Sequence, residues 1–378
     1  MNRKKTTLDN ENYALLQLYK DPLLIFFASL LPILWYFKRD ALAILPTYIH
    51  WPTIVALSGL LMITNCFKYS GLFSKLASRM LKQVKTERAL WIGLILFSAL
   101  IATFLTNDIA LFLVIPFTIQ LNRMADLNIM PLFIFETIAV NLGSLITPIG
   151  NPQNIYVWQK FNIGFGRFIL HMLPVGAILL GILVLGCFLF APTHLITLNG
   201  RQDYEIPKTN LILAGGGAIG LVGYLLADGL GYGLPFVCLF FVILLFGRPK
   251  ILLSMDWGLI ILFILLFIDM GMFSGLSPIR EVTQQLALHD SSHVFLTGAL
   301  YAQLLSNVPT TLLLSKFTHA WYPLAAGVNI GGNGLLIGSF ANLIAVRITK
   351  KPKLALMYHR YSIPFFVVSV IVVYLLLM

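Results

Sequence analysis

The chain alternates long apolar stretches with short polar connectors. The uninterrupted stretches have the length of helices that cross a bilayer or most of it, and they lie at about 22–37, 52–67, 168–190, 210–227, 230–247, 256–275 and 361–378. A basic amphipathic segment at 68–88 predicts a helix on the membrane surface. No extramembrane segment is long enough to form a soluble domain of its own.

Four further apolar segments are interrupted by Asn, Thr, Ser, Gly and Pro. Two of them predict re-entrant hairpins, at 89–121 with a break at 106–108 and at 293–318 with a break at 306–311. The other two predict helices broken at the membrane midplane, at 131–158 and 320–346. Non-helical backbone survives at membrane depth only inside protein or beside a water-filled cavity, so these breaks indicate a functional site.

The two broken helices contain an internal repeat. Residues 140–155 read VNLGSLITPIGNPQNI, and 188 positions later residues 328–343 read VNIGGNGLLIGSFANL. Six ungapped positions are identical, namely Val140, Asn141, Gly143, Ile149, Gly150 and Asn154 with Val328, Asn329, Gly331, Ile337, Gly338 and Asn342. The expected organisation is a cytoplasmic tail (1–21), a first repeat (22–190), a cytoplasmic linker (191–209) and a second repeat (210–378).

Composition supports this class of protein. Of 378 residues 58% are hydrophobic and 11% are charged, and the mean hydropathy is +0.86, unlike a soluble globular domain. The formal net charge of +11 follows membrane orientation, because with a cytoplasmic amino terminus the external segments hold only Lys38, Arg39, Lys160, Arg167, Arg280 and Lys316. The pattern therefore predicts a multi-pass membrane protein with a cytoplasmic amino terminus and no nucleic-acid partner.

The predicted fold class is an all-α polytopic membrane protein. It has about nine spanning helices and two re-entrant hairpins in two inverted repeats, with two broken helices at the midplane. In this layout the two hairpins enter from opposite sides of the membrane.

The polar breaks supply the candidate binding groups. Free N–H groups at half-helix amino ends suit an anion, whereas free carbonyls and Asn side chains suit a small hard cation such as sodium. The candidate substrate or ion ligands are Thr106, Asn107, Asp108, Asn141, Ser144, Thr147, Asn151, Asn154, Ser306, Asn307, Thr310, Thr311, Asn329, Asn333, Ser339 and Asn342. No Lys or Arg lies at a tip. The alternative interpretation is that these side chains only join helices to one another.

Three acidic residues are expected within the membrane, where an ionisable group is costly and is a functional candidate by default. Asp108 lies at a predicted hairpin tip and is the first choice for a carrier of protons or sodium. Glu136 on the first broken helix is a second candidate. Asp269 is a third candidate for a proton carrier and equally a candidate for a structural hydrogen-bond partner.

The sequence contains no motif that is typical of an enzyme active site. The sequence lacks HExxH, GxSxG and a nucleotide-binding loop, and its three Cys residues lie in apolar segments. His289 and His293 have helical zinc spacing but no third ligand. We expect no enzyme activity and no cofactor, with sodium or a proton as the coupling ion.

The tip motifs resemble a known superfamily. TNDIALFLVIP (106–116) and SNVPTTLLL (306–314) are similar to the hairpins of arsenite permeases, and TPIGNPQN (147–154) and GGNGLLIGSFANLI (331–344) resemble the broken helices of the ion-transporter superfamily. This superfamily includes citrate-type transporters, sodium/proton antiporters and sodium/dicarboxylate symporters. Within it, the chain resembles the bacterial inner-membrane group called YbiR-like, which implies a place in a bacterial inner membrane.

The resemblance implies two inverted repeats, an elevator-like motion and, often, a homodimer. It places sodium ligands at Thr106, Asn107, Asn141, Thr147 and Asn151, and at Ser306, Asn307, Asn329, Asn333 and Ser339, with Asn107, Asn141, Asn307 and Asn329 as the central set. The dicarboxylate symporters carry Ser-Asn-Thr at both tips. Here the tips read Thr-Asn-Asp and Ser-Asn-Val, which favours a proton-linked or antiport mechanism.

The leading hypothesis is a secondary active transporter in the lipid bilayer for a small anion, either a di- or tricarboxylate or an oxyanion, coupled to sodium or protons. The first alternative is a sodium/proton antiporter, whose substrate is a cation. The second, from another class, is a non-transporting membrane receptor or scaffold.

Overall fold

A computed structural model describes residues 22–39, 44–81, 84–124, 127, 129–196, 209–286, 288–349 and 351–377. Within these ranges the chain is helical, and its β structure is a single isolated bridge between Thr86 and Leu195. The all-α fold class is therefore confirmed. The predicted tail lies outside the described residues, as does most of the predicted linker.

The chain folds into two compact units, and each unit combines segments from both ends of the sequence. The first joins Met1–Tyr69 with Gly215–Gln285, and the second joins Ser70–Ala214 with Leu286–Met378. Each unit thus draws on both predicted repeats.

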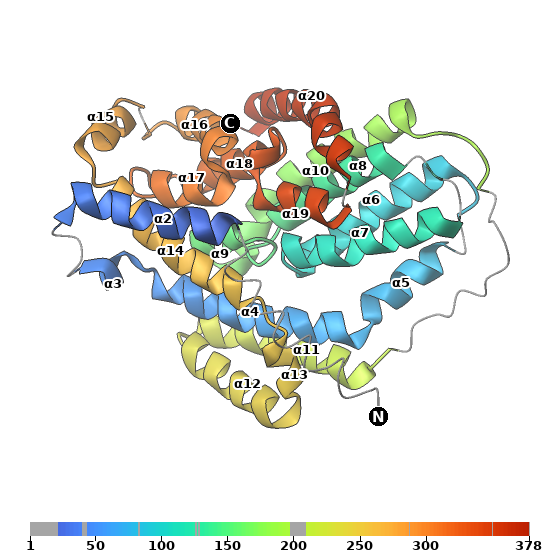
Figure 1. Cartoon of the computed structure of the whole chain (residues 1–378), viewed down its shortest axis with the longest axis horizontal. Helices are drawn as coiled ribbons and strands as arrows, with labels where there is room; N and C mark the ends of the chain where they lie inside the picture. The colour runs from blue at the N-terminus through green and yellow to red at the C-terminus, as the bar shows by residue number, and fades with distance from the viewer. Residues whose placement is uncertain are drawn as a thin grey trace. The chain divides into compact units, whose positions relative to one another are not determined.

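The first unit contains helices of varied length. They are α2 (Pro22–Phe37), α3 (Leu45–Tyr48), α4 (Trp51–Ser70), α11 (Leu211–Gly229), α12 (Gly233–Gly247), α13 (Pro249–Leu253), α14 (Trp257–Phe273) and α15 (Ser277–Gln285). The last residue of α4 and the first turn of α11 belong to the second unit. Helix α14 packs on α2 through Leu34, Ile268 and Met272 (Figure 1).

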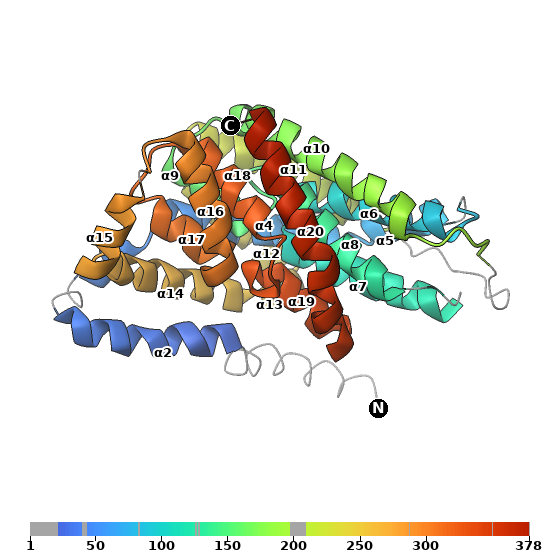
Figure 2. The same cartoon turned by 90° about the horizontal axis from the view of Figure 1, so that it is seen from above.

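The second unit contains both hairpins and both broken helices. Its helices are α5 (Leu72–Leu81), α6 (Glu87–Phe104), α7 (Asn107–Met124), α8 (Ile129–Leu145), α9 (Pro152–Lys160), α10 (Phe165–Phe190), α16 (Ser291–Leu305), α17 (Asn307–Leu314), α18 (Trp321–Gly331), the short η2 (Leu336–Gly338), α19 (Phe340–Thr349) and α20 (Pro352–Leu377). The α6–α7 hairpin packs on α8, and α16 packs on α18 with α20 beside both (Figure 2).

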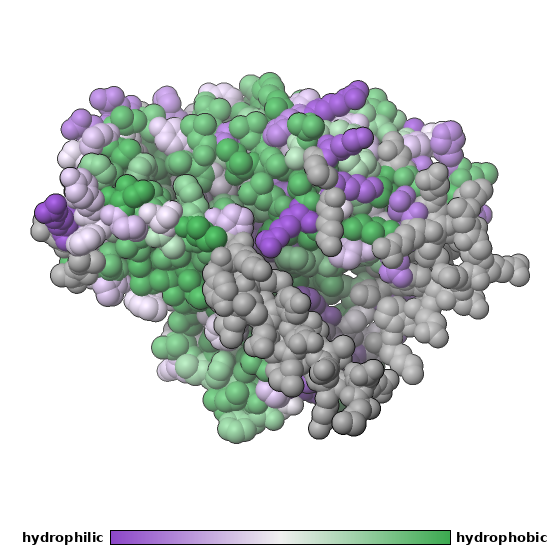
Figure 3. Space-filling view, viewed as in Figure 1, coloured by the Kyte–Doolittle hydropathy of each residue, from purple (hydrophilic) through white to green (hydrophobic). Residues whose placement is uncertain are grey.

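The buried and exposed helices follow the apolar pattern. Helix α8 is buried along nearly its whole length, whereas α10 and α20 expose large apolar side chains such as Leu189 and Leu356. Hydrophobic side chains cover much of the visible surface (Figure 3). A surface of this kind is stable in contact with lipid and not with water.

Four described helices are long and apolar enough to cross a membrane: Glu87–Phe104, Phe165–Phe190, Leu211–Gly229 and Lys353–Leu376. A fifth candidate is the pair α14 and α15, bent by 83°. Other apolar helices, such as α2, α8 and α12, are shorter, so the total of about nine spans stays a prediction.

Local sequence explains the ends of the broken helices. Helix α9 begins with Pro at its first position, where no N–H is needed, and the Asn151 side chain caps it by accepting from the Asn154 N–H at 2.9 Å. Helix α20 begins at Pro352, earlier than the predicted start near residue 361. Charged residues on its first turns, such as Lys353 and Arg360, interrupt the apolar run, so the apolar pattern alone did not reveal this part of the helix.

Candidate functional site

The first hairpin tip meets the first helix break. Helix α6 ends at Phe104, α7 begins at Asn107, and the backbone N–H of Asn107 donates to the Gly150 carbonyl at 2.9 Å. Gly150 lies just before the amino end of α9. The amino ends of two helices, α7 and α9, therefore lie close together.

The second tip meets the second break in the same way. The Ser306 hydroxyl donates to the Gly338 carbonyl at 3.5 Å, and the Asn307 amide donates to the Ser339 hydroxyl at 3.4 Å. Gly338 is the repeat counterpart of Gly150 and lies just before α19. The amino ends of α17 and α19 form a second pair.

Glycines let each hairpin approach its broken helix. A Cβ on Gly143 of α8 would overlap the Ala99 backbone of α6, and a Cβ on Gly331 of α18 would lie 2.7 Å from the Ala299 carbonyl oxygen of α16. Gly143 and Gly331 are repeat counterparts. The repeated glycine therefore has a packing cause in both halves.

Side chains of the hairpins repeat the same contact. The Thr103 hydroxyl donates to the Ala99 carbonyl at 2.9 Å and to the Gly143 carbonyl at 3.2 Å. The Gln303 amide donates to the Ala299 and Gly331 carbonyls at 3.1 and 2.6 Å. Each side chain binds a carbonyl at the end of the helix, which also accepts a backbone N–H of the turn that follows, from Ile146 at 3.3 Å and from Gly334 at 3.2 Å.

One Asn in each half bridges its own break. The Asn154 amide donates to the Ser144 and Thr147 carbonyls at 3.2 and 3.0 Å. At the counterpart positions, the Asn342 amide donates to Gly332 and Leu335 at 2.8 and 3.4 Å. These two residues hold the broken backbone in shape.

The same asparagines join the two halves reciprocally. The Asn141 amide donates to Asn342 Oδ1 at 2.9 Å, and the Asn329 amide donates to Asn154 Oδ1 at 2.8 Å. Since Asn329 is the counterpart of Asn141 and Asn342 that of Asn154, each half makes the contact that the other makes. Reciprocal contacts of this kind are what a two-fold axis between two copies generates. The four residues, Asn141, Asn154, Asn329 and Asn342, are called the Asn brace below.

Several buried oxygens near the breaks have no hydrogen-bond partner within the described part of the chain. They are Thr106 Oγ1, Gln153 Oε1, Thr310 Oγ1 and Asn333 Oδ1. Buried polar atoms are nearly always satisfied in proteins, so an unsatisfied group points to a ligand. Uncharged oxygens of this type suit an alkali cation better than a softer metal ion.

Four further candidate ligands, at the first break or on α17, form hydrogen bonds. Ser144, Asn151 and Thr147 belong to the first break: Asn151 donates to Asn329 Oδ1 at 2.8 Å and to Ser144 Oγ at 3.1 Å, and Thr147 donates to the Thr103 carbonyl at 2.7 Å. Thr311 lies on α17 and donates to the Asn307 carbonyl.

The three acids occupy different places. Asp108 lies in the first turn of α7, and Glu136 lies on α8 with its side chain fully buried. Asp269 lies on α14 in the other compact unit, buried and without a hydrogen-bond partner for its carboxyl oxygens in the described ranges. The structure therefore gathers every candidate except Asp269 into the second unit.

Sequence reasoning missed Gln153 and Gln303. Gln153 donates to Asn329 Oδ1 at 3.2 Å, and Gln303 holds the second break from the hairpin, where its Oε1 also accepts from the Leu335 N–H. Both are polar residues within apolar segments, and this feature of the sequence could have identified them as candidates. Gln153 stands between Pro152 and Asn154 in the repeat itself.

Two broken helices, each packed against a helical hairpin and with paired polar breaks, are typical of membrane transport proteins. The family model described as Citrate transporter matches residues 23–321. The chain is 37% identical over 336 residues to inner membrane protein YbiR of Escherichia coli, covering 88% of this chain and 89% of that protein.

Other relatives are more distant. An uncharacterized transporter of Methanocaldococcus jannaschii is 33% identical over 308 residues, or 80% of this chain and 82% of the relative. A 46 kDa membrane protein of Mycobacterium leprae is 23% identical over 346 residues, or 80% of each. The chain belongs to the citrate transporter family and is a multi-pass membrane transporter. The resemblance to the ion-transporter superfamily is confirmed.

Proposed function

We propose that the protein is a secondary active transporter of the inner membrane that carries a small anion, a di- or tricarboxylate or an oxyanion, coupled to sodium or protons. The observation that carries the proposal is the gathering of four helix amino ends, those of α7, α9, α17 and α19, around one polar centre. Each end contributes partial positive charge, which favours an anion.

Coupling to a cation follows from the same arrangement. No Lys or Arg lies at either tip, so a multiply charged anion lacks a fixed counter-charge there. The unpartnered oxygens of Thr106 and Asn333 supply ligands for a small cation. An anion and one or more cations bound together would neutralise each other, which links their movements thermodynamically.

An elevator-like alternating-access motion fits the division of the chain. Every tip and break residue lies in the second unit, so that unit can carry the solute as one body. The Asn brace supports this assignment because it fastens the two halves of the centre to each other. A homodimer remains an expectation from the family resemblance.

Asp108 favours a second candidate function, a sodium/proton antiporter. It is the one carboxylate at a tip, and the matching position of the second tip is Val308. A carboxylate that binds either sodium or a proton, but not both, is sufficient for antiport.

One experiment separates the two functions. Proteoliposomes with a trapped pH dye receive a pulse of sodium, with potassium as control, and then citrate, succinate, phosphate and arsenite in turn with each ion. The proposal predicts no proton movement from sodium alone, and uptake of at least one anion that depends on sodium or on a pH gradient. Proton efflux driven by sodium alone and lost in Asp108→Asn would establish antiport. Uptake of none of the anions, with no antiport, would contradict both.

A further inference from the structure

Helices α7 and α8 meet at a second polar contact, away from the tips and breaks. The Thr118 hydroxyl of α7 donates to Glu136 Oε1 of α8 at 2.6 Å, and both side chains have no exposed surface. The other carboxyl oxygen, Oε2, is buried and has no hydrogen-bond partner in the described residues. The Thr118–Glu136 hydrogen bond therefore leaves the second oxygen of a buried carboxyl able to bind a proton.

No charge compensates this carboxyl in the described part of the molecule. The titratable and charged groups on the helices packed against α8 are Glu87 and Arg88 on α6, Asp108 and Arg123 on α7, Arg167, His171 and Cys187 on α10, Tyr322 on α18, Arg347 on α19, and Lys353, Tyr358, His359, Arg360, Tyr361 and Tyr374 on α20. The side chain of Arg123 lies outside the described residues, and Glu136 forms neither a hydrogen bond nor an ion pair with any of the described groups. An isolated carboxylate in such surroundings costs several kcal/mol, and the neutral acid costs less.

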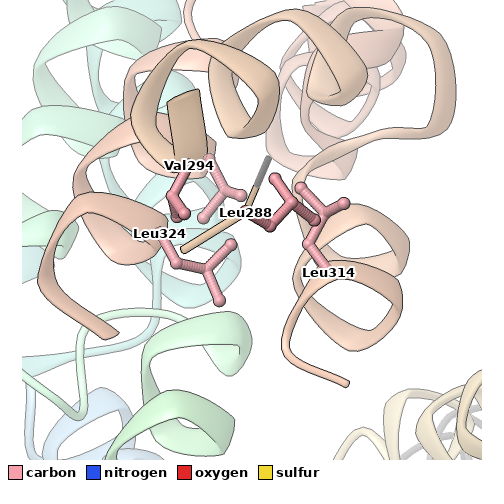
Figure 4. Packing of buried hydrophobic residues seen from close by; sticks show 5 residues of the cluster. Leu288, Val294, Leu314 and Leu324 are labelled. Atoms are coloured by element: carbon pink, nitrogen blue, oxygen red, sulfur yellow. The ribbon is translucent and has the colours of Figure 1, made fainter. Parts of the chain in front are cut away.

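The second half of the molecule shows that the fold does not need a carboxyl at this position. The repeat counterpart of Glu136 is Leu324. Leu324 packs in an apolar cluster with Leu288, Val294, Leu314 and Val328 (Figure 4). One half thus fills the position with an ordinary core residue, and the other half fills it with an acid at an energetic cost. Such a cost is retained for function and not for packing.

The position also has a route to the solute centre. Glu136 precedes Asn141 of the Asn brace by five residues, which is about 7.5 Å along a helix. Thr118 lies on the helix that begins at the tip residue Asn107. The Thr118–Glu136 pair therefore joins the two helices that carry the first tip and the first break.

We propose that Glu136 is a proton-binding site of the transport unit and that its protonation is coupled to ion occupancy at the first break. This inference rests on the proposed function and assigns protons a coupling role in it. The proton comes from water and forms an O–H bond at Oε2, while Oε1 keeps its bond from Thr118. Proton binding converts the carboxylate into a neutral acid, and this changes how strongly the α7–α8 pair is held together.

The test reads the carboxyl directly and needs no known substrate. Infrared spectra of the reconstituted full chain are recorded over a pH series in water and in deuterium oxide, with Asp108→Asn and Asp269→Asn as controls. We expect a protonated-carboxyl carbonyl band that disappears at alkaline pH, shifts in deuterium oxide, is lost in Glu136→Gln and is retained in both controls. Absence of the band, or a band that neither titrates nor exchanges, would overturn the proposal.

Coupling is measured in the same samples. Sodium chloride, compared with choline chloride, is expected to move the titration midpoint of the Glu136 band. A midpoint that stays fixed would refute coupling while leaving the anion-transport proposal intact.

A purely structural role predicts the opposite mutant pattern. Glu136→Gln keeps an oxygen that accepts from Thr118, so a structural pair would tolerate it and would fail in Thr118→Val. Our proposal predicts that Glu136→Gln loses uptake or solute exchange driven by a pH gradient, and that Thr118→Val keeps the titrating band. Glu136→Leu, which installs the residue of the second half, is expected to fold and to lose the same band.

Discussion

Ser306 lies at the second tip with φ 71° and ψ 157°, a backbone region that is essentially restricted to glycine. Its counterpart Thr106 does not have a positive φ. Strain of this kind persists where the surrounding contacts hold it, and here it directs the Ser306 hydroxyl toward the Gly338 carbonyl. The two tips are therefore similar in contacts and different in backbone shape.

This strain gives a stability prediction. Ser306→Gly relieves the backbone, whereas Ser306→Ala keeps the Cβ and loses the hydroxyl. We expect the Gly variant to exceed the Ala variant in free energy of unfolding by about 1 kcal/mol or more. Thermal unfolding in detergent measures this difference. At the unstrained first tip, Thr106→Gly is expected to have a lower free energy of unfolding than Thr106→Ala. A reversal of either order would contradict the assignment of backbone strain to Ser306.

At the scale of the elements, two pairs of helices approach each other closely at glycine residues. The contact of α6 with α8 passes over Gly143, and that of α16 with α18 passes over Gly331. Close approach is what allows Thr103 and Gln303 to reach the carbonyls of the breaks. Packing between these helices thus shapes the candidate site directly.

Gly143→Ala should damage this packing. Its new Cβ would overlap the Ala99 backbone, so α6 must move away, and we expect a loss of about 1–3 kcal/mol of stability together with loss of transport. Gly181→Ala on α10 is the matched control, because no atom lies within 4 Å of a Cβ there. Unfolding temperature and transport are measured for both. Equal behaviour of the two variants would disprove the close approach.

The Asn brace can be tested by its energetics. In the cycle of Asn141→Ala with Asn342→Ala, the two changes share one hydrogen bond, so we expect a coupling energy of about 0.5–3 kcal/mol. The control pairs Asn141→Ala with Asn65→Ala, whose amide donates to the Ile251 carbonyl in the other compact unit. In that control pair, the two changes in free energy of unfolding should be additive. Additive changes for Asn141→Ala and Asn342→Ala would show that the hydrogen bond between the two side chains does not form.

Sequence predicted the elements better than their pairing. Gly, Pro and Asn within apolar segments marked the positions of both breaks, because few other residues interrupt a helix in lipid. It could not show that Asn141 meets Asn342 and not its own neighbours, since a helix break leaves the direction of a side chain undetermined. Gln153 was missed for the same reason, and Glu136 gained meaning only when its partner Thr118 was known.

At the scale of the molecule, the repeat and the compact units divide the chain differently. The repeats follow one another in sequence, whereas each unit takes segments from both. No pattern along the chain could reveal this, because it depends on long-range packing. Both tips and both breaks lie in one unit, as the proposed elevator-like motion requires.

That arrangement predicts that both halves are required for transport. Asn107 and Asn307 cap the first turns of α7 and α17 by accepting from the next backbone N–H, at 3.1 and 2.9 Å. Loss of either amide would disturb one pair of helix amino ends and leave the other intact.

The most direct test is solute exchange in proteoliposomes, using whichever labelled anion of the panel the native protein carries. It compares Asn107→Ala, Asn307→Ala and, as a control, Asn210→Ala, whose side chain accepts from the Leu213 N–H at the start of α11. The account predicts that each tip variant folds and loses exchange, whereas Asn210→Ala retains it. Normal exchange by either folded tip variant would contradict a solute site built from both halves.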